Sequence, residues 1–216
     1  MLRLLMALGL GMVASTFSDH SKSLKIDTSL DESAVESPAE IKTLPVVLLE
    51  NASEKEAHTL EVLQARGITH PHALAVILGN IKQESLFEHN ICEGGARVNY
   101  EHCRSGGFGL IQWTTQGRYD GLGRHARNLG LSPTSFETQL SYVFREREWK
   151  QVEPHFMGRG DSIDSYMRSA HRWLGWGIHG NRTRYAFDYL SRMSTVDVSL
   201  DEHPTSKFTY DHHYLK

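Results

Sequence analysis

A single glutamate, Glu84, ends an apolar stretch with helical spacing. Apolar side chains recur every three or four positions over residues 73–84, and Glu84 falls on the same face. Glutamate is rarely buried unless it is paired or functional, and burial disfavours the ionised form of a carboxyl group, which raises its pKa. Glu84 is therefore either a helix-end carboxylate that pairs with an arginine or a proton donor that works near neutral pH.

A glycine-rich segment follows about one loop later. Residues 106–113 read Gly-Gly-Phe-Gly-Leu-Ile-Gln-Trp. Because glycine has no side chain, the backbone of this segment is able to approach a ligand closely. Gln112 offers an amide donor and acceptor, and Trp113 offers a flat apolar face suited to a sugar ring. The alternative is a core hairpin that buries the tryptophan.

Together, the two segments resemble the phage tail lysozyme family, which lies within the lysozyme-like superfamily. The residues that carry the resemblance are Gly79-Asn-Ile-Lys-Gln-Glu-Ser85, Gly107-Phe-Gly-Leu-Ile-Gln-Trp-Thr114 and Gly117-Arg118. Soluble lytic transglycosylases are similar, with a Glu-Ser pair followed by a Gly-x-x-Gly-Leu-x-Gln segment. The resemblance covers roughly residues 55–193. The chain departs from the pattern in an insertion between the two motifs, which contains both cysteines.

The resemblance implies a mainly α, two-lobed lysozyme-like fold with a small β-hairpin region and a substrate cleft between the lobes. It implies a muramidase that cleaves peptidoglycan glycan strands between N-acetylmuramic acid and N-acetylglucosamine, and we expect neither a cofactor nor a metal. Glu84 matches the general acid of the family, and Gln112 matches a glutamine that lines its cleft. We expect substrate contacts from residues in and near the motifs: Ser85, Phe108, Gly109, Gln112, Trp113, Trp176 and Tyr185.

The sequence leaves alternatives for the second group that acts with Glu84 in the reaction. Glycosidic cleavage requires the leaving oxygen to be protonated as the bond breaks, which is the role expected of Glu84. Three acidic residues are candidates for a second carboxylate that activates water, or are otherwise solvated charges: Glu93, Glu101 and Asp120. If none faces Glu84, the 6-hydroxyl of muramic acid attacks and leaves an anhydro product, as in lytic transglycosylases. A third reading is a non-catalytic virion protein that binds wall glycan.

Aromatic and arginine residues lie close together between positions 172 and 185. Such residues are able to line a cleft that holds a sugar and its peptide. We expect Trp173 to belong to the core. Trp176 and Tyr185 are either cleft walls or ordinary packing residues.

Helical patterns dominate residues 53–195, where we expect the lysozyme-like domain. Ser53 and Glu56 form a capping-box pattern, which predicts the start of the first helix. Later helices are predicted over residues 70–84, 118–129, 135–149, 162–174 and 181–193. Residues 44–49 form either a strand or an apolar anchor, and residues 108–113 form a short strand or hairpin arm.

The remaining segments bear on location and partners. The formal net charge of -3 argues against a nucleic-acid partner. Residues 1–17 combine one arginine, an apolar run and small residues, which is typical of a secretory signal or of a terminal helix that docks onto its own protein or a partner. Residues 18–52 are expected to be an extended linker or arm, and residues 196–216 an irregular tail. We expect either a virion location, with the N-terminal segment and arm on other virion proteins, or export to the periplasm or cell wall.

Cys92 and Cys103 lie within one loop between the two motifs. Their spacing is not that of a compact zinc site. They either form a disulfide or stay reduced, according to the compartment in which the protein folds.

Overall fold

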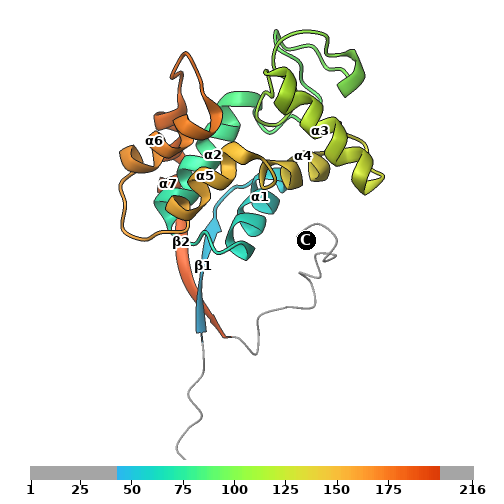
Figure 1. The fold of residues 1–216 in the computed structure, drawn as a ribbon. Helices are drawn as coiled ribbons and strands as arrows, with labels where there is room; N and C mark the ends of the chain where they lie inside the picture. Colours follow the sequence, from blue (N-terminus) through green and yellow to red (C-terminus); the bar gives the residue numbers. More distant parts are fainter. Residues whose placement is uncertain (1–42, 200–216) are drawn as a thin grey trace, which may run out of the picture. The chain divides into compact units, whose positions relative to one another are not determined.

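The computed structural model describes residues 43–199, which lie within one compact unit of the chain, Glu40–Lys216. Expectations for residues 1–42 and 200–216 fall outside the described residues. In chain order, the elements are β1 (Thr43–Leu49), α1 (Glu54–Ala65), α2 (Pro71–Ser85), the 3-10 turn η1 (Tyr100–His102), α3 (Gln116–Leu129), α4 (Phe136–Val143), α5 (Arg147–Phe156), α6 (Ile163–Leu174), α7 (Arg182–Ser191) and β2 (Met193–Ser199) (Figure 1). The fold is mainly α, as the sequence predicts.

The ends of several helices follow local sequence signals. The capping box at the start of α1 is present, because the Ser53 side chain accepts from the backbone of Glu56 and the Glu56 side chain accepts from the backbone of Ser53. Ser162 caps α6 in the same general way, by accepting from the backbone N–H of Ser165. Gly130 ends α3 in the left-handed conformation that glycine adopts readily, with φ of 67°.

The single helix predicted over residues 135–149 is wrong. The structure has two helices there, α4 and α5, separated by a break at residues 144–146. Glu146 adopts an extended backbone, with φ of -63° and ψ of 144°, and becomes the residue that precedes α5. Its carboxylate is buried and bound by two other side chains, so tertiary contacts override the continuous helical pattern.

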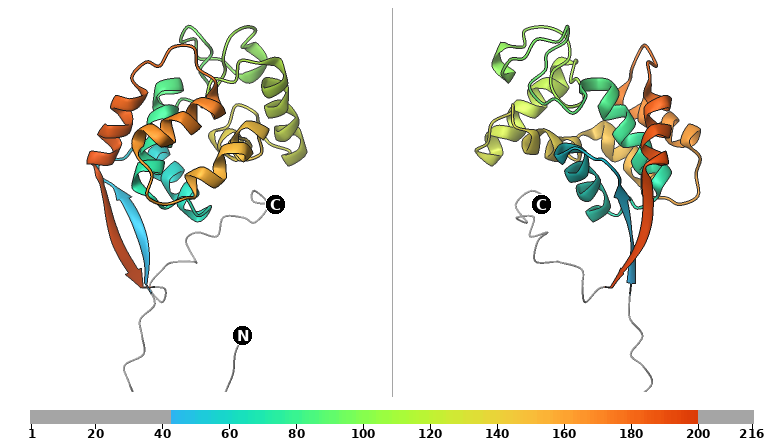
Figure 2. Two further views of the ribbon diagram at one scale, coloured as in Figure 1. Left: turned by 60° about the vertical axis from the view of Figure 1, so that its left-hand side comes forward. Right: turned by 180° about the vertical axis from the view of Figure 1, so that it is seen from behind.

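The segment after α7 forms a second strand. β2 pairs with β1 in an antiparallel ribbon, in which Val47 faces Thr195 and Leu49 faces Met193 (Figure 2). Residues 44–49 are therefore a strand, one of the two alternatives. The irregular tail expected from residue 196 onward is wrong for residues 196–199, which belong to β2. The Gln64 side chain holds β1 against α1 by bonding both the N–H and the carbonyl of Val47, at 2.7 and 3.0 Å.

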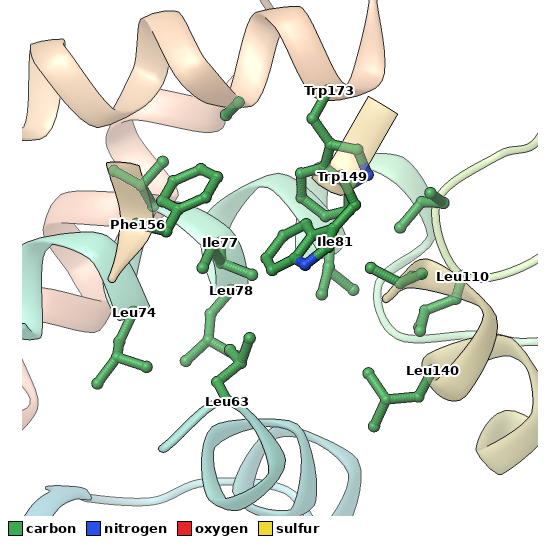
Figure 3. Packing of buried hydrophobic residues seen from close by; sticks show 14 of the residues in the cluster. Leu63, Leu74, Ile77, Leu78, Ile81, Leu110, Leu140, Trp149, Phe156 and Trp173 are labelled. Atoms are coloured by element: carbon green, nitrogen blue, oxygen red, sulfur yellow. The ribbon is translucent and has the colours of Figure 1, made fainter. Parts of the chain in front are cut away.

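Helix α2 runs through the core and contacts α1, α6 and α7. Every residue from 73 to 81 is buried, so this helix is covered almost all the way round. Beside it, Trp149 packs edge-on against Trp173, with ring centroids 4.8 Å apart, and stacks on Phe156 (Figure 3). Trp173 is a core residue, as predicted. The core therefore fixes the axis of the helix that carries Glu84 in its last turn.

We expect Gly79→Ala to destabilise the protein, because α2 and α7 touch at this position. A Cβ at residue 79 would lie 2.7 Å from the backbone nitrogen of Ala186 and 3.1 Å from the carbonyl oxygen of Arg182. Overpacking of this kind typically costs about 1–3 kcal/mol, which outweighs the gain of roughly 1 kcal/mol from replacing a helical glycine by alanine. Urea denaturation measures the change in free energy of unfolding.

Gly117→Ala is the matched control for this substitution. Gly117 is also helical, and a Cβ there would meet no other heavy atom within 4 Å. We expect it to leave the stability unchanged or to raise it. Equal stabilities for the two variants would contradict a close approach of α7 to α2.

Candidate functional site

Glu84 lies in the last turn of α2, and the chain turns sharply after it. Leu86 and Phe87 both adopt left-handed backbone conformations, with φ of 54° and 63°, which non-glycine residues rarely do. Ser85 fastens this turn to the glycine-rich segment, since its hydroxyl donates to the carbonyl of Leu110 at 2.8 Å. Ser85 is buried and was expected to touch substrate. Its observed contact is structural, and it sets the position of Glu84 relative to residues 106–113.

The carboxylate of Glu84 is paired with Arg182, at the start of α7. The arginine Nη2 donates to Glu84 Oε1, and the side chain of Glu84 is 15% exposed while that of Arg182 is 5% exposed. The Nη1 of Arg182 donates to the carbonyls of Ile178 and His179, at 2.9 and 2.7 Å. Its guanidinium also lies over the ring of Trp176, 4.4 Å from the centroid. Arg182 therefore joins Glu84 to the loop between α6 and α7.

Burial raises the pKa of the Glu84 carboxyl above its ordinary value. The nearby cations Arg182 and Arg118 act in the opposite direction, but burial has the largest effect. The side chain nevertheless keeps a small exposed edge. A carboxyl group in these surroundings retains its proton to higher pH than an exposed glutamate and is still reachable by a reactant.

The segment around Gln112 forms a tight hairpin. Phe108 and Trp113 exchange backbone hydrogen bonds at 3.3 and 3.0 Å, and Gly109 takes a left-handed φ of 73°. A Cβ on Gly109 would collide with the side chain of Gln139, whose Oε1 accepts from the N–H of Leu110. The glycine is thus required for packing of this hairpin, which is the hairpin arm expected from the sequence.

Three expected substrate contacts in this hairpin are wrong, because the residues are buried. Phe108 and Trp113 are both fully buried, so neither presents a face to a sugar. Gly109 is also buried, beneath Gln139. Gln112 is half-buried, and its Nε2 donates to the carbonyl of Gly109 at 2.9 Å. Within the described part of the chain its Oε1 accepts no hydrogen bond, so Gln112 keeps an acceptor for a ligand.

The indole of Trp113 instead leads to a buried ion pair. Its Nε1 donates to Glu146 Oε1 at 2.9 Å. Arg118 binds the same carboxylate with two bonds, from Nε to Oε1 at 2.7 Å and from Nη2 to Oε2 at 2.8 Å. Burial raises the pKa of Glu146, and Arg118 opposes that effect. This pair places the positive charge of Arg118 within electrostatic reach of Glu84.

None of the three candidate second carboxylates contributes to the shift in the pKa of Glu84. Glu93 accepts from the backbone N–H of Gly107 at 3.0 Å, Glu101 is exposed in η1, and Asp120 accepts from the side chain of Gln116. The charged groups that shift the pKa of Glu84 are both arginines. Within residues 43–199, the surroundings of Glu84 are therefore cationic.

Trp176 and Tyr185 both contact cationic side chains. Both are half-buried. Trp176 lies under the guanidinium of Arg182, and the Lys82 ammonium lies 5.2 Å from the ring centroid of Tyr185. Their role as cleft walls stays a prediction.

The loop between the motifs is closed by a disulfide. Cys92 and Cys103 are bonded, with Cα atoms 5.5 Å apart, so the oxidised alternative is the one that the structure forms. Across residues 43–199, no cluster of three or more His, Cys, Asp or Glu side chains is arranged to hold a metal ion. No helix in the same range is long and apolar enough to cross a membrane.

The chain was compared with known protein families. A family model described as phage tail lysozyme matches residues 54–186, which is more than half of the 216-residue chain. No curated protein matches the sequence. The matched range begins with α1, contains Glu84 and the hairpin, and ends within α7, after Arg182.

Proposed function

Because this chain belongs to the phage tail lysozyme family, we propose that it cleaves the glycan strands of peptidoglycan with Glu84 as the general acid. The observation that carries the proposal is a carboxyl group whose pKa is raised by burial and whose edge stays exposed. In its protonated form, Glu84 donates a proton to the glycosidic oxygen as the bond to N-acetylmuramic acid breaks. Gln112 supplies an acceptor for a sugar hydroxyl or amide.

In this mechanism, Arg182 stabilises the carboxylate that Glu84 becomes after it has donated its proton. Proton donation leaves a carboxylate on Glu84, and the guanidinium of Arg182 is already in contact with it. A charge-assisted hydrogen bond stabilises that product form and holds the side chain in one orientation. The same arginine lowers the pKa of Glu84, so burial must outweigh it for the acid to be protonated before the reaction.

Two candidate reactions differ in the group that attacks the oxocarbenium-like sugar formed as the glycosidic bond breaks. Hydrolysis requires a base that activates water, whereas in the transglycosylase reaction the 6-hydroxyl of the muramic acid attacks and gives an anhydro product. Within residues 43–199 no second carboxylate contributes to the pKa shift of Glu84, which favours the second reaction, because a lone Glu84 is able to act first as the acid and then as the base. We keep hydrolysis by a muramidase as the alternative.

Incubation of the purified protein with cell-wall peptidoglycan tests the proposal. We expect soluble muropeptides to be released, and mass spectrometry of their ends separates the two reactions. Ends lighter by one water than reducing ends indicate the transglycosylase, and reducing ends indicate the hydrolase. Release of no fragments from any wall preparation would refute the enzymatic proposal and favour a virion protein that only binds glycan.

The place of action follows from the substrate. A phage tail lysozyme that meets peptidoglycan acts either as part of the virion or after export to the periplasm or cell wall. Contact of the N-terminal segment and arm with other virion proteins belongs to the first alternative.

We expect Arg182→Gln to move the alkaline limb of the pH–rate profile to higher pH. A general acid works only while protonated, so the rate falls as the pH rises through the pKa of Glu84. Arg182 lowers that pKa, and its removal therefore raises the pKa and extends activity upward in pH. The measurement is kcat for muropeptide release as a function of pH.

Arg182→Lys is the control, because it keeps the charge and loses the planar guanidinium. We expect its alkaline limb to stay near that of the wild-type protein, even if its rate is lower. A limb that moves to lower pH in Arg182→Gln would contradict the assignment of Glu84 as the acid.

A further inference from the structure

A pocket of about 480 Å³ lies between α6 and the loop that leads to α7. Six residues line it: Met167, Arg168, His171, Arg172, Trp176 and His179. None of them is acidic, and four of them carry or can acquire a positive charge. The pocket therefore favours an anionic ligand.

The two arginines of this pocket have hydrogen-bond donors to spare. Arg168 and Arg172 are exposed and lie four residues apart on α6, so their side chains extend from the same face. Neither makes a salt bridge within residues 43–199. Arg172 donates from Nη2 to the Ser169 hydroxyl at 2.7 Å, and Arg168 acts at longer range on the pKa of Asp161, whose main partner is His155. A guanidinium has five N–H donors in a planar fork, so both can bind an anion without breaking an existing ion pair.

Trp176 connects this pocket to the proposed catalytic group. The His171 ring meets the Trp176 ring edge-on, with centroids 4.8 Å apart. On the Trp176 ring also lies the guanidinium of Arg182, which pairs with Glu84. The helices α2, α6 and α7, which carry these residues, contact one another (Figure 1). A ligand in the pocket would thus be separated from Arg182, which pairs with Glu84, by the side chain of Trp176.

We propose that this pocket binds a carboxylate of the peptide attached to the wall glycan. The proposal rests on the function proposed above and names the part of the substrate that these residues recognise. Arginine guanidinium groups match the geometry of a carboxylate with two parallel hydrogen bonds. Trp176 and Met167 add apolar surface next to the arginines, which a small side chain such as that of alanine would cover. A phosphodiester polymer offers the charge without that apolar group.

Glycan with and without peptide tests the proposal. The substrates are intact peptidoglycan and the same glycan after an amidase has removed its peptides. We expect Arg168→Gln/Arg172→Gln to lower kcat/KM on the intact glycan by about tenfold or more, since a lost charge-assisted hydrogen bond is worth at least a factor of ten. On the stripped glycan the same variant should match the wild-type protein within about twofold.

Arg147→Gln/Lys150→Gln is the matched control, because it removes two exposed positive charges from α5. We expect it to leave the ratio of the two substrates unchanged. An equal loss on intact and stripped glycan in the Arg168→Gln/Arg172→Gln variant, or an equal change of ratio in the control, would overturn the peptide-binding proposal.

A binding measurement separates this proposal from the catalytic one. The peptide released by the amidase is titrated into Glu84→Gln protein, with and without the two α6 substitutions, and followed by NMR. Binding that the α6 substitutions abolish supports the pocket, even if the wild-type protein releases no muropeptides, a result that would refute the catalytic proposal alone. No binding of the peptide, or binding of inorganic phosphate in its place, would overturn the assignment to a peptide carboxylate.

Discussion

Glu84→Gln is expected to lower kcat for muropeptide release by about 10²–10⁴-fold, the usual contribution of positioned acid catalysis. Glutamine has nearly the same shape as glutamate, and its Oε1 still accepts from Arg182. It has no acidic proton to give to the glycosidic oxygen. Initial rates on purified peptidoglycan, with KM determined separately, measure the effect and show that the loss is in kcat.

The same substitution should leave the fold intact. Burial raises the pKa of Glu84 in the folded state, so the folded protein favours the protonated, neutral form. The stability that Glu84 contributes is present below its ordinary pKa and is lost as the pH rises through the folded-state pKa. A neutral glutamine avoids that loss, which offsets the weaker bond to Arg182. We expect a circular dichroism spectrum like that of the wild-type protein at neutral pH.

Glu61→Gln serves as the control for Glu84→Gln, because Glu61 is an exposed carboxylate on α1. We expect it to retain full activity. Wild-type activity in folded Glu84→Gln would rule out Glu84 as the acid, and an equal loss in Glu61→Gln would point to a general effect of charge.

The parts of the site that the sequence predicts are those with a local or periodic signal. The apolar period of residues 73–84 predicts α2 because this helix is buried, and the same period places Glu84 on its inner side. For residues 106–113 the alternative of a core hairpin that buries the tryptophan is confirmed, since Phe108 and Trp113 exchange backbone hydrogen bonds. The family model matches a range, residues 54–186, that contains both of these motifs.

The parts that the sequence does not predict depend on contacts between distant residues. Arg182 lies 98 residues from Glu84, and an arginine at the start of a helix gives no sign of its partner. Glu146 falls inside an apparently continuous helical pattern, so only its buried bonds to Trp113 and Arg118 reveal the break there. The burial of Trp113 is a further example, because the local sequence is the same whether a tryptophan next to a candidate site faces a ligand or packs in the core.

The second large effect is expected at Arg118. Arg118→Met leaves the Glu146 carboxylate, whose side chain is 1% exposed, without a cation. Breaking a buried ion pair by removing one partner typically costs about 3–5 kcal/mol, a large part of the roughly 5–15 kcal/mol that stabilises a domain. Urea denaturation at neutral pH measures this loss, and Arg124→Met, an exposed arginine on the same helix, is the control.

The double variant Arg118→Met/Glu146→Gln separates the lost pair from the stranded charge. If the cost of Arg118→Met comes from an uncompensated carboxylate, then neutralising Glu146 should recover much of it, because no buried charge remains. For the same reason, Arg118→Met should become more stable as the pH falls: without the arginine the folded-state pKa of Glu146 rises further, and protonation then favours the folded state. A loss of stability that is no larger than in Arg124→Met would mean that the pair contributes nothing.

Arg118 also lowers the pKa of Glu84, so the alkaline limb of activity should move to higher pH both in Arg118→Met and in the double variant, whereas stability recovers only in the double variant. Two readouts that separate in this way would show that one arginine both stabilises the fold and tunes the acid.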